Sequence, residues 1–184
     1  MSSGRNRIKI TIFGARHTGQ GPLSRAWGRT SADLPALQPA CIYERVVSID
    51  GKKATVAAWV LSLHPRFDYM RKSMYSKSDG FIYTFDARSQ PEASLRYLEP
   101  FLDEVKLVLE DAIPCQVLVG SAMDPTLPRP LYLDDAVSNF MKKNGRMDFM
   151  EIDLTNKDEF FSMVDDIFKH LLKSITGAMP SLGR

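Results

Sequence analysis

Cysteine, long apolar runs and an excess of one charge are all scarce in this 184-residue chain. The two cysteines, Cys41 and Cys115, lie in separate apolar stretches, which argues against a disulfide framework and against a zinc site of the CxxC type. No stretch approaches the roughly 18 uninterrupted apolar residues of a membrane span. The 24 basic and 22 acidic residues leave a net charge of +2, so we expect no nucleic-acid partner.

The chain also lacks the short signals that direct proteins to membranes. Its first residues, MSSGRNR, contain no apolar signal segment, and Gly4 is not in the second position that myristoylation requires. Residues 179–184 contain no cysteine for prenylation. We therefore expect a cytoplasmic protein without a direct membrane anchor.

Apolar residues are plentiful enough to form one folded domain. Hydrophobic residues make up 44% of the sequence, which is sufficient to bury a core. Regular apolar patterns begin near residue 7 and end near residue 175. We expect flexible residues 1–6, one domain over 7–175 and a flexible tail over 176–184.

The first half of the chain carries strand patterns and one strong turn signal. Ile8–Phe13 alternates apolar and polar residues, which predicts a strand, and a glycine-rich loop and a helix follow it. The β-rich runs Cys41–Ile49 and Ala54–Leu63 flank Asp50-Gly51, a dipeptide that favours tight hairpins. These two runs are therefore expected to pair antiparallel.

The second half alternates strands with helices. Short β-rich runs occur at Phe81–Phe85, Cys115–Val119 and Met147–Ile152, and helical spacing of apolar residues occurs between and after them. In the first of these helices, Pro100 should cause a kink or a restart. The pattern predicts an α/β fold: a mostly parallel six-stranded sheet with one antiparallel edge strand and helices on both faces.

The loop from Gly14 to Gly19 has the glycine spacing of a phosphate-binding P-loop. Such a loop follows a strand, precedes a helix, and surrounds phosphate oxygens with backbone N–H groups. The same glycines also suit a tight strand-to-helix turn that holds no ligand. The spacing alone leaves both interpretations open.

A more specific pattern extends over roughly residues 7 to 173. It consists of short segments throughout the chain: Ile49–Lys53, Ala58-Trp59, Arg66-Phe67, Tyr75, Asp79–Tyr83, Phe85-Asp86, Val117–Gly120, Asp124 and Phe149–Glu151. With these segments the chain resembles the Ras superfamily, with the spacing of its Rab and Ras branches, and the resemblance implies a Ras-like P-loop G-domain.

The residues that the family uses for phosphate and magnesium are altered. The P-loop lysine position is Gln20, and the position of the magnesium-binding hydroxyl is Gly21. The first-switch threonine should lie within 38–40, where no hydroxyl occurs. The family pattern Asp-Thr-Ala-Gly-Gln falls on Val60–His64, where only His64 retains a group that can orient water, and without lysine and magnesium we expect no catalysis from it.

The guanine-reading motifs are also reduced. Ser121–Asp124 keeps only the aspartate of Asn-Lys-x-Asp, and Asp153–Thr155 replaces Ser-Ala-Lys. The resemblance thus leaves a vestigial nucleotide site of Gly14, Arg16, Gly19, Gln20 and Asp124. Asp124 precedes a proline and can equally be a turn residue.

A possible protein-binding surface comes from the same resemblance. Ile42, Trp59 and Met74 fall where Rab-like proteins present an apolar patch to effectors, and Tyr75 is adjacent. Alternatively, Trp59 and Tyr75 fill the layer between sheet and helix.

These departures lead us to expect a pseudo-GTPase that acts as a protein-binding or scaffolding subunit, without catalytic residues, metal or obligatory cofactor. The first alternative is a divergent GTPase that binds GDP or GTP through the P-loop backbone and Asp124. A further alternative is a heterodimer partner of an active small GTPase.

Overall fold

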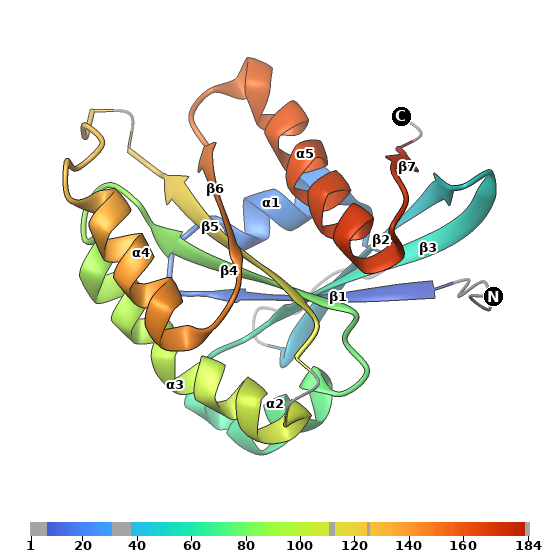
Figure 1. Cartoon of the computed structure of the whole chain (residues 1–184), viewed down its shortest axis with the longest axis horizontal. Helices are drawn as coiled ribbons and strands as arrows, with labels where there is room; N and C mark the ends of the chain where they lie inside the picture. Colours follow the sequence, from blue (N-terminus) through green and yellow to red (C-terminus); the bar gives the residue numbers. More distant parts are fainter. Residues whose placement is uncertain (1–6, 31–37, 111–112, 125, 183–184) are drawn as a thin grey trace.

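A computed structural model describes residues 7–30, 38–110, 113–124 and 126–182. Over these residues, strands and helices alternate and helices cover both faces of one curled sheet (Figure 1). The strands are β1 (Arg7–Gly14), β2 (Ala40–Ile49), β3 (Lys52–Leu61), β4 (Gly80–Asp86), β5 (Cys115–Ala122), β6 (Asp148–Asp153) and β7 (Pro180–Ser181). The helices are α1 (Gln20–Trp27), α2 (Asp68–Tyr75), α3 (Pro91–Leu109), α4 (Leu133–Asn144) and α5 (Lys157–Thr176), with a short 3-10 turn at Pro65–Phe67.

The sheet in the described part of the chain has seven strands in the order β6-β5-β4-β1-β3-β2-β7. Strands β6, β5, β4, β1 and β3 are parallel, and β2 is antiparallel to β3. Our expectation of six strands was wrong, because β7 pairs with Ser48 and Ile49 and replaces β2 at the edge. Residues 180–181 therefore belong to the sheet rather than to a flexible tail; a two-residue strand is too short to show an alternating pattern.

The hairpin between β2 and β3 forms where the sequence predicted it. Asp50 and Gly51 both have positive φ, 51° and 75°, as the tightest hairpin turns require. Pairing then continues without interruption from Ile49 opposite Lys52 to the far end of both strands.

Strand β1 lies in the middle of the sheet and is buried on both faces. Ile10 and Ile12 pack on the side covered by α1 and α5, whereas Phe13 packs on the side of α2, α3 and α4 (Figure 1). On the first side, the rings of Trp27 and Phe168 stack with their centroids 3.8 Å apart and 5° between their planes. This stack joins α1 to α5 across the face of the sheet.

The sequence predicts a kink or a restart at Pro100, and helix α3 continues through this residue without restarting. One helix was not expected. Helix α2 was not predicted, because among its eight residues only Arg71 and Tyr75 are buried and they give no clear apolar periodicity. At α5, the predicted cap is present: the side chain of Asn156 accepts a hydrogen bond from the backbone N–H of Glu159 at 3.3 Å.

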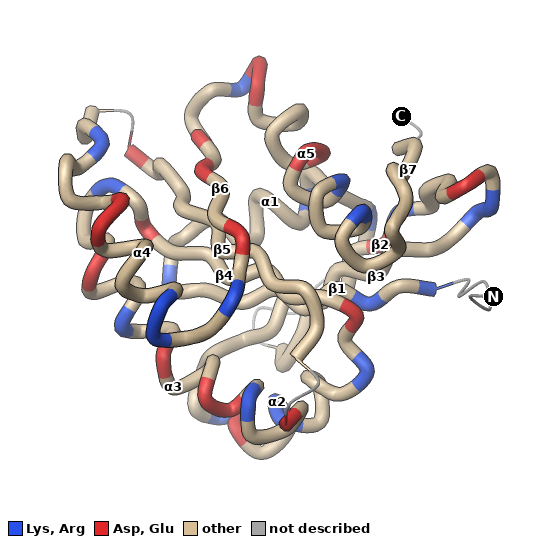
Figure 2. Tube along the Cα trace, viewed as in Figure 1, with Lys and Arg blue, Asp and Glu red and all other residues tan. Residues whose placement is uncertain are grey.

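Basic and acidic residues are interspersed over the described elements (Figure 2). None of the helices in the described ranges has the length and apolar composition needed to cross a membrane.

We predict that Trp27→Ala lowers the free energy of unfolding by about 3 to 5 kcal/mol, because it removes a large side chain that is 1% exposed. Urea denaturation followed by circular dichroism measures this change. Phe161→Ala is the matched control, since this ring is 62% exposed and its loss should cost no more than about 0.5 kcal/mol. Equal losses in the two variants would contradict the central role of the Trp27–Phe168 stack.

Candidate functional site

The loop between β1 and α1 begins where β1 approaches β4 very closely. A Cβ atom placed on Gly14 would lie 1.9 Å from Thr84 Oγ1 and 2.5 Å from the Thr84 carbonyl oxygen. Only glycine fits there. The first glycine of the phosphate-loop pattern is therefore required by packing, whether or not a phosphate binds.

The interior of this loop is hydrogen-bonded by its own side chains. The buried hydroxyl of Thr18 donates to the carbonyl oxygen of Ala15 at 2.7 Å and lies 2.7 Å from the hydroxyl of Thr84. Gln20 Nε2 donates to the same Ala15 oxygen at 3.2 Å. A lysine at position 20 would direct a charge toward phosphate, whereas this amide turns back and closes the loop.

The second glycine of the pattern is covered by a residue from the loop after β6. Gly19 adopts φ 86°, and a Cβ placed on it would lie 2.4 Å from Leu154 Cδ1. Leu154 stands at the middle position of the segment that replaces Ser-Ala-Lys. Arg16, by contrast, is exposed and makes no hydrogen bond or ion pair with any other described residue.

Two aspartates at the same edge of the sheet are held by their own loops. Asp124 Oδ1 accepts hydrogen bonds from the backbone N–H and the hydroxyl of Thr126, at 2.9 and 2.7 Å. Asp153 makes the same pair of bonds with Thr155, at 2.8 and 2.6 Å. These hydrogen bonds lower the pKa of both carboxyl groups. Asp124 thus has the geometry of a turn residue.

The loops after β5 and β6 are also tied to each other. The backbone N–H of Leu154 donates to the carbonyl oxygen of Ala122 at 3.1 Å.

Asp86, at the end of β4, accepts from the backbone N–H groups of Arg88 and Ser89 at 2.8 and 3.0 Å. Within the described ranges, no group of three or more His, Cys, Asp or Glu side chains is arranged to hold a metal ion.

The end of β3 is buried, and the segment after it leads into a 3-10 turn. Leu61, the last residue of β3, is buried in the layer between sheet and helices. His64 is exposed, and its Nδ1 accepts a hydrogen bond from the backbone N–H of Arg66 at 3.2 Å, capping the 3-10 turn. His64 therefore has a local structural role at the start of this turn.

Helix α2 is fastened to α3 by a buried charge network. Arg71 donates through Nε and Nη2 to the two carboxylate oxygens of Glu104, at 2.9 and 2.8 Å, and its guanidinium lies 4.8 Å from the ring centroid of Phe101. Arg71 Nη1 lies 2.8 Å from Asp68 Oδ1 in an ion pair without hydrogen-bond geometry. The Tyr75 hydroxyl donates to Glu104 Oε2 at 3.1 Å.

Tyr75 was therefore placed wrongly on the protein-binding surface. Its side chain is 0% exposed, because its ring packs against Phe13 and Phe81 and its hydroxyl is satisfied by Glu104. Burial, reinforced by the Glu104 carboxylate, raises the pKa of Tyr75 well above its usual range.

The other residues expected on that surface are half-buried and close together. Ile42 lies directly opposite Trp59 in the β2–β3 register. Lys9 Nζ lies 4.6 Å from the Trp59 ring centroid and also donates to the carbonyl oxygens of Met74 and Ser76 at the end of α2. Burial lowers the pKa of Lys9. Lys9 thus joins β1, β3 and α2.

Sequence reasoning did not identify Thr18, Leu154 or Glu104 as parts of this arrangement. Thr18 is the only one with a local signal, because it lies within the glycine-rich loop. The partners of the other two lie far away in sequence, on Gly19 and on Arg71.

We predict that Gly19→Ala destabilises the domain more than Gly51→Ala does. Both glycines have positive φ, so both variants should lose about 1 to 2 kcal/mol from backbone strain. Gly19→Ala should lose about 1 to 3 kcal/mol more through overlap with Leu154, whereas nothing lies within 4 Å of a Cβ on Gly51. In a Leu154→Ala background, the difference in stability loss between Gly19→Ala and Gly51→Ala should become smaller. Denaturant titration measures these losses, and an unchanged difference would contradict the contact between Gly19 and Leu154.

We also predict that Glu104→Gln loosens α2. Removing this charge leaves the buried Arg71 guanidinium with only the exposed Asp68 as a charged partner and should cost about 2 to 4 kcal/mol, less than for a fully buried pair because the Glu104 side chain is 23% exposed. Hydrogen exchange of the α2 amides should accelerate. Glu99→Gln, which breaks the exposed pair with Lys143 on the same helix, is the control and should change stability by about 0.5 kcal/mol or less.

Comparison with known proteins identifies the family. The sequence model of the Ras family matches residues 31–177. Two Ras and EF-hand domain-containing protein homologs, from Caenorhabditis briggsae and Caenorhabditis elegans, are 27% and 26% identical to the chain over 97 residues. This stretch is 53% of the chain and 15% of each relative, so the chain spans only a small part of the length of these relatives. With most of its residues matched by the family model, the chain belongs to the Ras family.

Proposed function

We propose that this Ras-family chain is a pseudo-GTPase, a protein-binding or scaffolding subunit that holds one conformation and does not hydrolyse GTP. The observation that carries the proposal is the closed β1–α1 loop, in which Thr18 and Gln20 satisfy the Ala15 carbonyl oxygen from inside. Such a loop is complete without a phosphate.

The chemistry of phosphoryl transfer supports the same conclusion. The reaction requires Mg²⁺ and a cation to neutralise charge on the β- and γ-phosphates. The sequence resemblance aligns Gln20 and Gly21 with the cation and the magnesium ligand, and neither carries a positive charge or a hydroxyl. The Asp124 and Asp153 carboxylates accept hydrogen bonds from Thr126 and Thr155 in their own loops.

A fixed α2 favours a scaffold over a switch. Switch segments in this family change order when the γ-phosphate is lost. Here the Arg71–Glu104 network fastens α2 at its middle and Lys9 fastens it at its C-terminal end. A constant surface around Ile42 and Trp59 would then serve a protein partner in the cytoplasm without reporting a nucleotide state.

The names of the relatives suit a modular role. They describe proteins in which a Ras domain and an EF-hand domain share one polypeptide. A Ras-like domain that provides a binding surface within a larger assembly is consistent with that organisation.

One observation keeps a second function open, a divergent switch that binds GDP or GTP through its backbone. Gly19 has the left-handed conformation at the start of α1, and no side chain caps that helix. Its first N–H groups could therefore receive an anion if the loop opened. Arg16, exposed beside the loop, would then supply a positive charge.

We predict that the purified chain releases no guanine nucleotide on heat denaturation and that its melting temperature does not respond to GDP or GTP with Mg²⁺. A ligand at about 100 times its dissociation constant would stabilise a binder by about 2.7 kcal/mol, a shift of about 5 to 10 °C for a chain of this size. Chromatography of the supernatant and thermal denaturation provide the two readouts.

Released nucleotide, or a shift that Asp124→Ala abolishes, would replace the pseudo-GTPase by the divergent switch. A shift that Asp124→Ala leaves intact would point to phosphate binding by the loop backbone alone, and would also contradict the nucleotide-free proposal.

A further inference from the structure

The connection between β5 and α4 concentrates exposed apolar side chains. Among the described residues, ten large hydrophobic side chains are exposed, and four of these lie between residues 123 and 132. They are Met123, Leu127, Leu131 and Tyr132. Leu131 is 99% exposed, so it contributes almost nothing to the core.

Two turns hold this connection in place. The backbone N–H of Leu127 donates to the carbonyl oxygen of Asp124 at 3.3 Å, and that of Leu133 donates to Pro130 at 3.2 Å. The second bond places Leu131 and Tyr132 at the two central positions of a four-residue turn. Glycine, asparagine, aspartate and serine are the usual residues there, so turn geometry does not explain an exposed Leu-Tyr pair.

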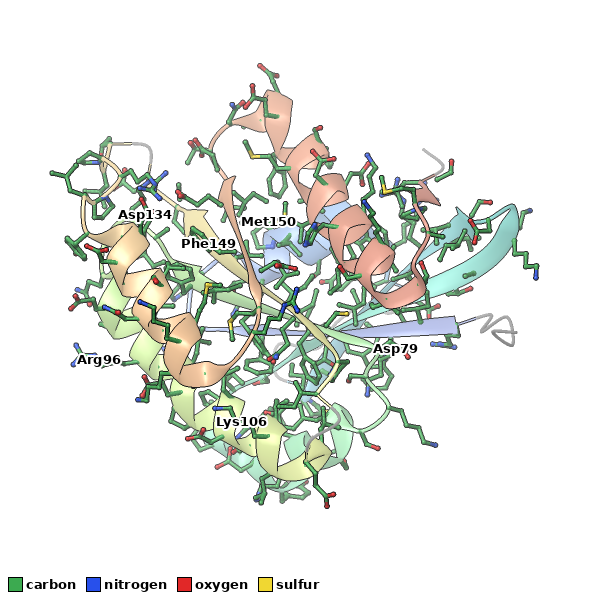
Figure 3. All side chains as sticks on the ribbon, in the orientation of Figure 1. Asp79, Arg96, Lys106, Asp134, Phe149 and Met150 are labelled. Atoms are coloured by element: carbon green, nitrogen blue, oxygen red, sulfur yellow. The ribbon has the colours of Figure 1, made fainter. Side chains whose placement is uncertain are left out.

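Arg129 and Leu133 attach the connection to the rest of the domain, whereas the side chains of Leu131 and Tyr132 are exposed. Arg129 Nε donates to Glu151 Oε1 of β6 at 2.7 Å, and its guanidinium also pairs with Asp134. Figure 3 shows Asp134 at the end of α4 that adjoins this connection. Leu133 is fully buried. The backbone is therefore held against the domain, and the exposed side chains are presented outward.

The sequence of the segment favours an extended polyproline conformation. Pro128 and Pro130 fix their own φ near −65°, and each disfavours the helical conformation in the residue before it, Leu127 and Arg129. Four consecutive residues are thus biased toward the polyproline II region, which leaves little conformational entropy to lose on binding.

We propose that residues 127–130 dock as a polyproline II segment into a groove on a partner protein that is lined by aromatic side chains, as in SH3, WW and EVH1 domains, while Leu131 and Tyr132 of the adjoining turn pack beside it. Leu131, Tyr132 and the two prolines provide the contact. Arg129 is already paired with Glu151 and Asp134, so recognition is apolar and depends little on salt. This surface is separate from Ile42 and Trp59 on the β2–β3 hairpin, and it functions with or without nucleotide.

The test measures binding of the full chain to a panel of purified SH3, WW and EVH1 domains by biolayer interferometry. At least one domain should bind, and Leu131→Ser should weaken that binding by about tenfold or more. Leu107→Ser is the matched control, because Leu107 is 70% exposed on α3, away from this connection. Both variants should keep the melting temperature of the unchanged chain.

A second variant, Pro128→Ala with Pro130→Ala, tests the polyproline requirement and should also weaken binding. The proposal fails if no domain of the panel binds, or if the Leu131 and Leu107 variants bind equally well. It also fails if added NaCl abolishes binding, which would indicate charge recognition instead. Sedimentation of the chain alone provides a further check, since self-association lost in Leu131→Ser would assign this surface to a second copy.

Discussion

The close approach of β1 to β4 at Gly14 and Thr84 is the constraint on which the site depends. Because Gly14 has no side chain, β1 and β4 can approach closely at this point, and Thr18 can reach Thr84. That contact sets the path of the loop and the start of α1. Helix α1 then brings Trp27 onto Phe168 of α5. The close contact at Gly14 and Thr84 thus positions the β1–α1 loop, and through α1 it also affects the packing on one face of the sheet.

Local patterns predicted most of the elements, because strands and amphipathic helices repeat over short distances. The β2–β3 hairpin follows from Asp50-Gly51, and α5 follows from its apolar spacing and its Asn156 cap. What could not be predicted depends on contacts between distant residues or on very short elements. Tyr75 is buried because its ring packs against Phe13 and Phe81 and its hydroxyl donates to Glu104, and β7 pairs with two residues of the distant strand β2.

At the candidate site, too, local sequence patterns could be predicted, whereas contacts between residues far apart in the sequence could not. Glycine spacing located the loop, and substitution at Gln20 indicated a loss of charge. The bond from Gln20 to Ala15 and the contact of Leu154 with Gly19 could not be predicted, because both depend on how loops meet in space. The residues of these loops bond and pack with one another, so the loops are held by their own hydrogen bonds and side-chain contacts.

The position of β7 has a further consequence for how the domain behaves among copies of itself. An edge strand offers a row of free N–H and C=O groups on which another chain can add a strand, a common route to aggregation. Along β2, residue Arg29 bridges to Glu44 at one point, and β7 covers Ser48 and Ile49 at another. These short pairings occupy parts of the β2 edge, so the backbone groups there are not open to a strand from another chain.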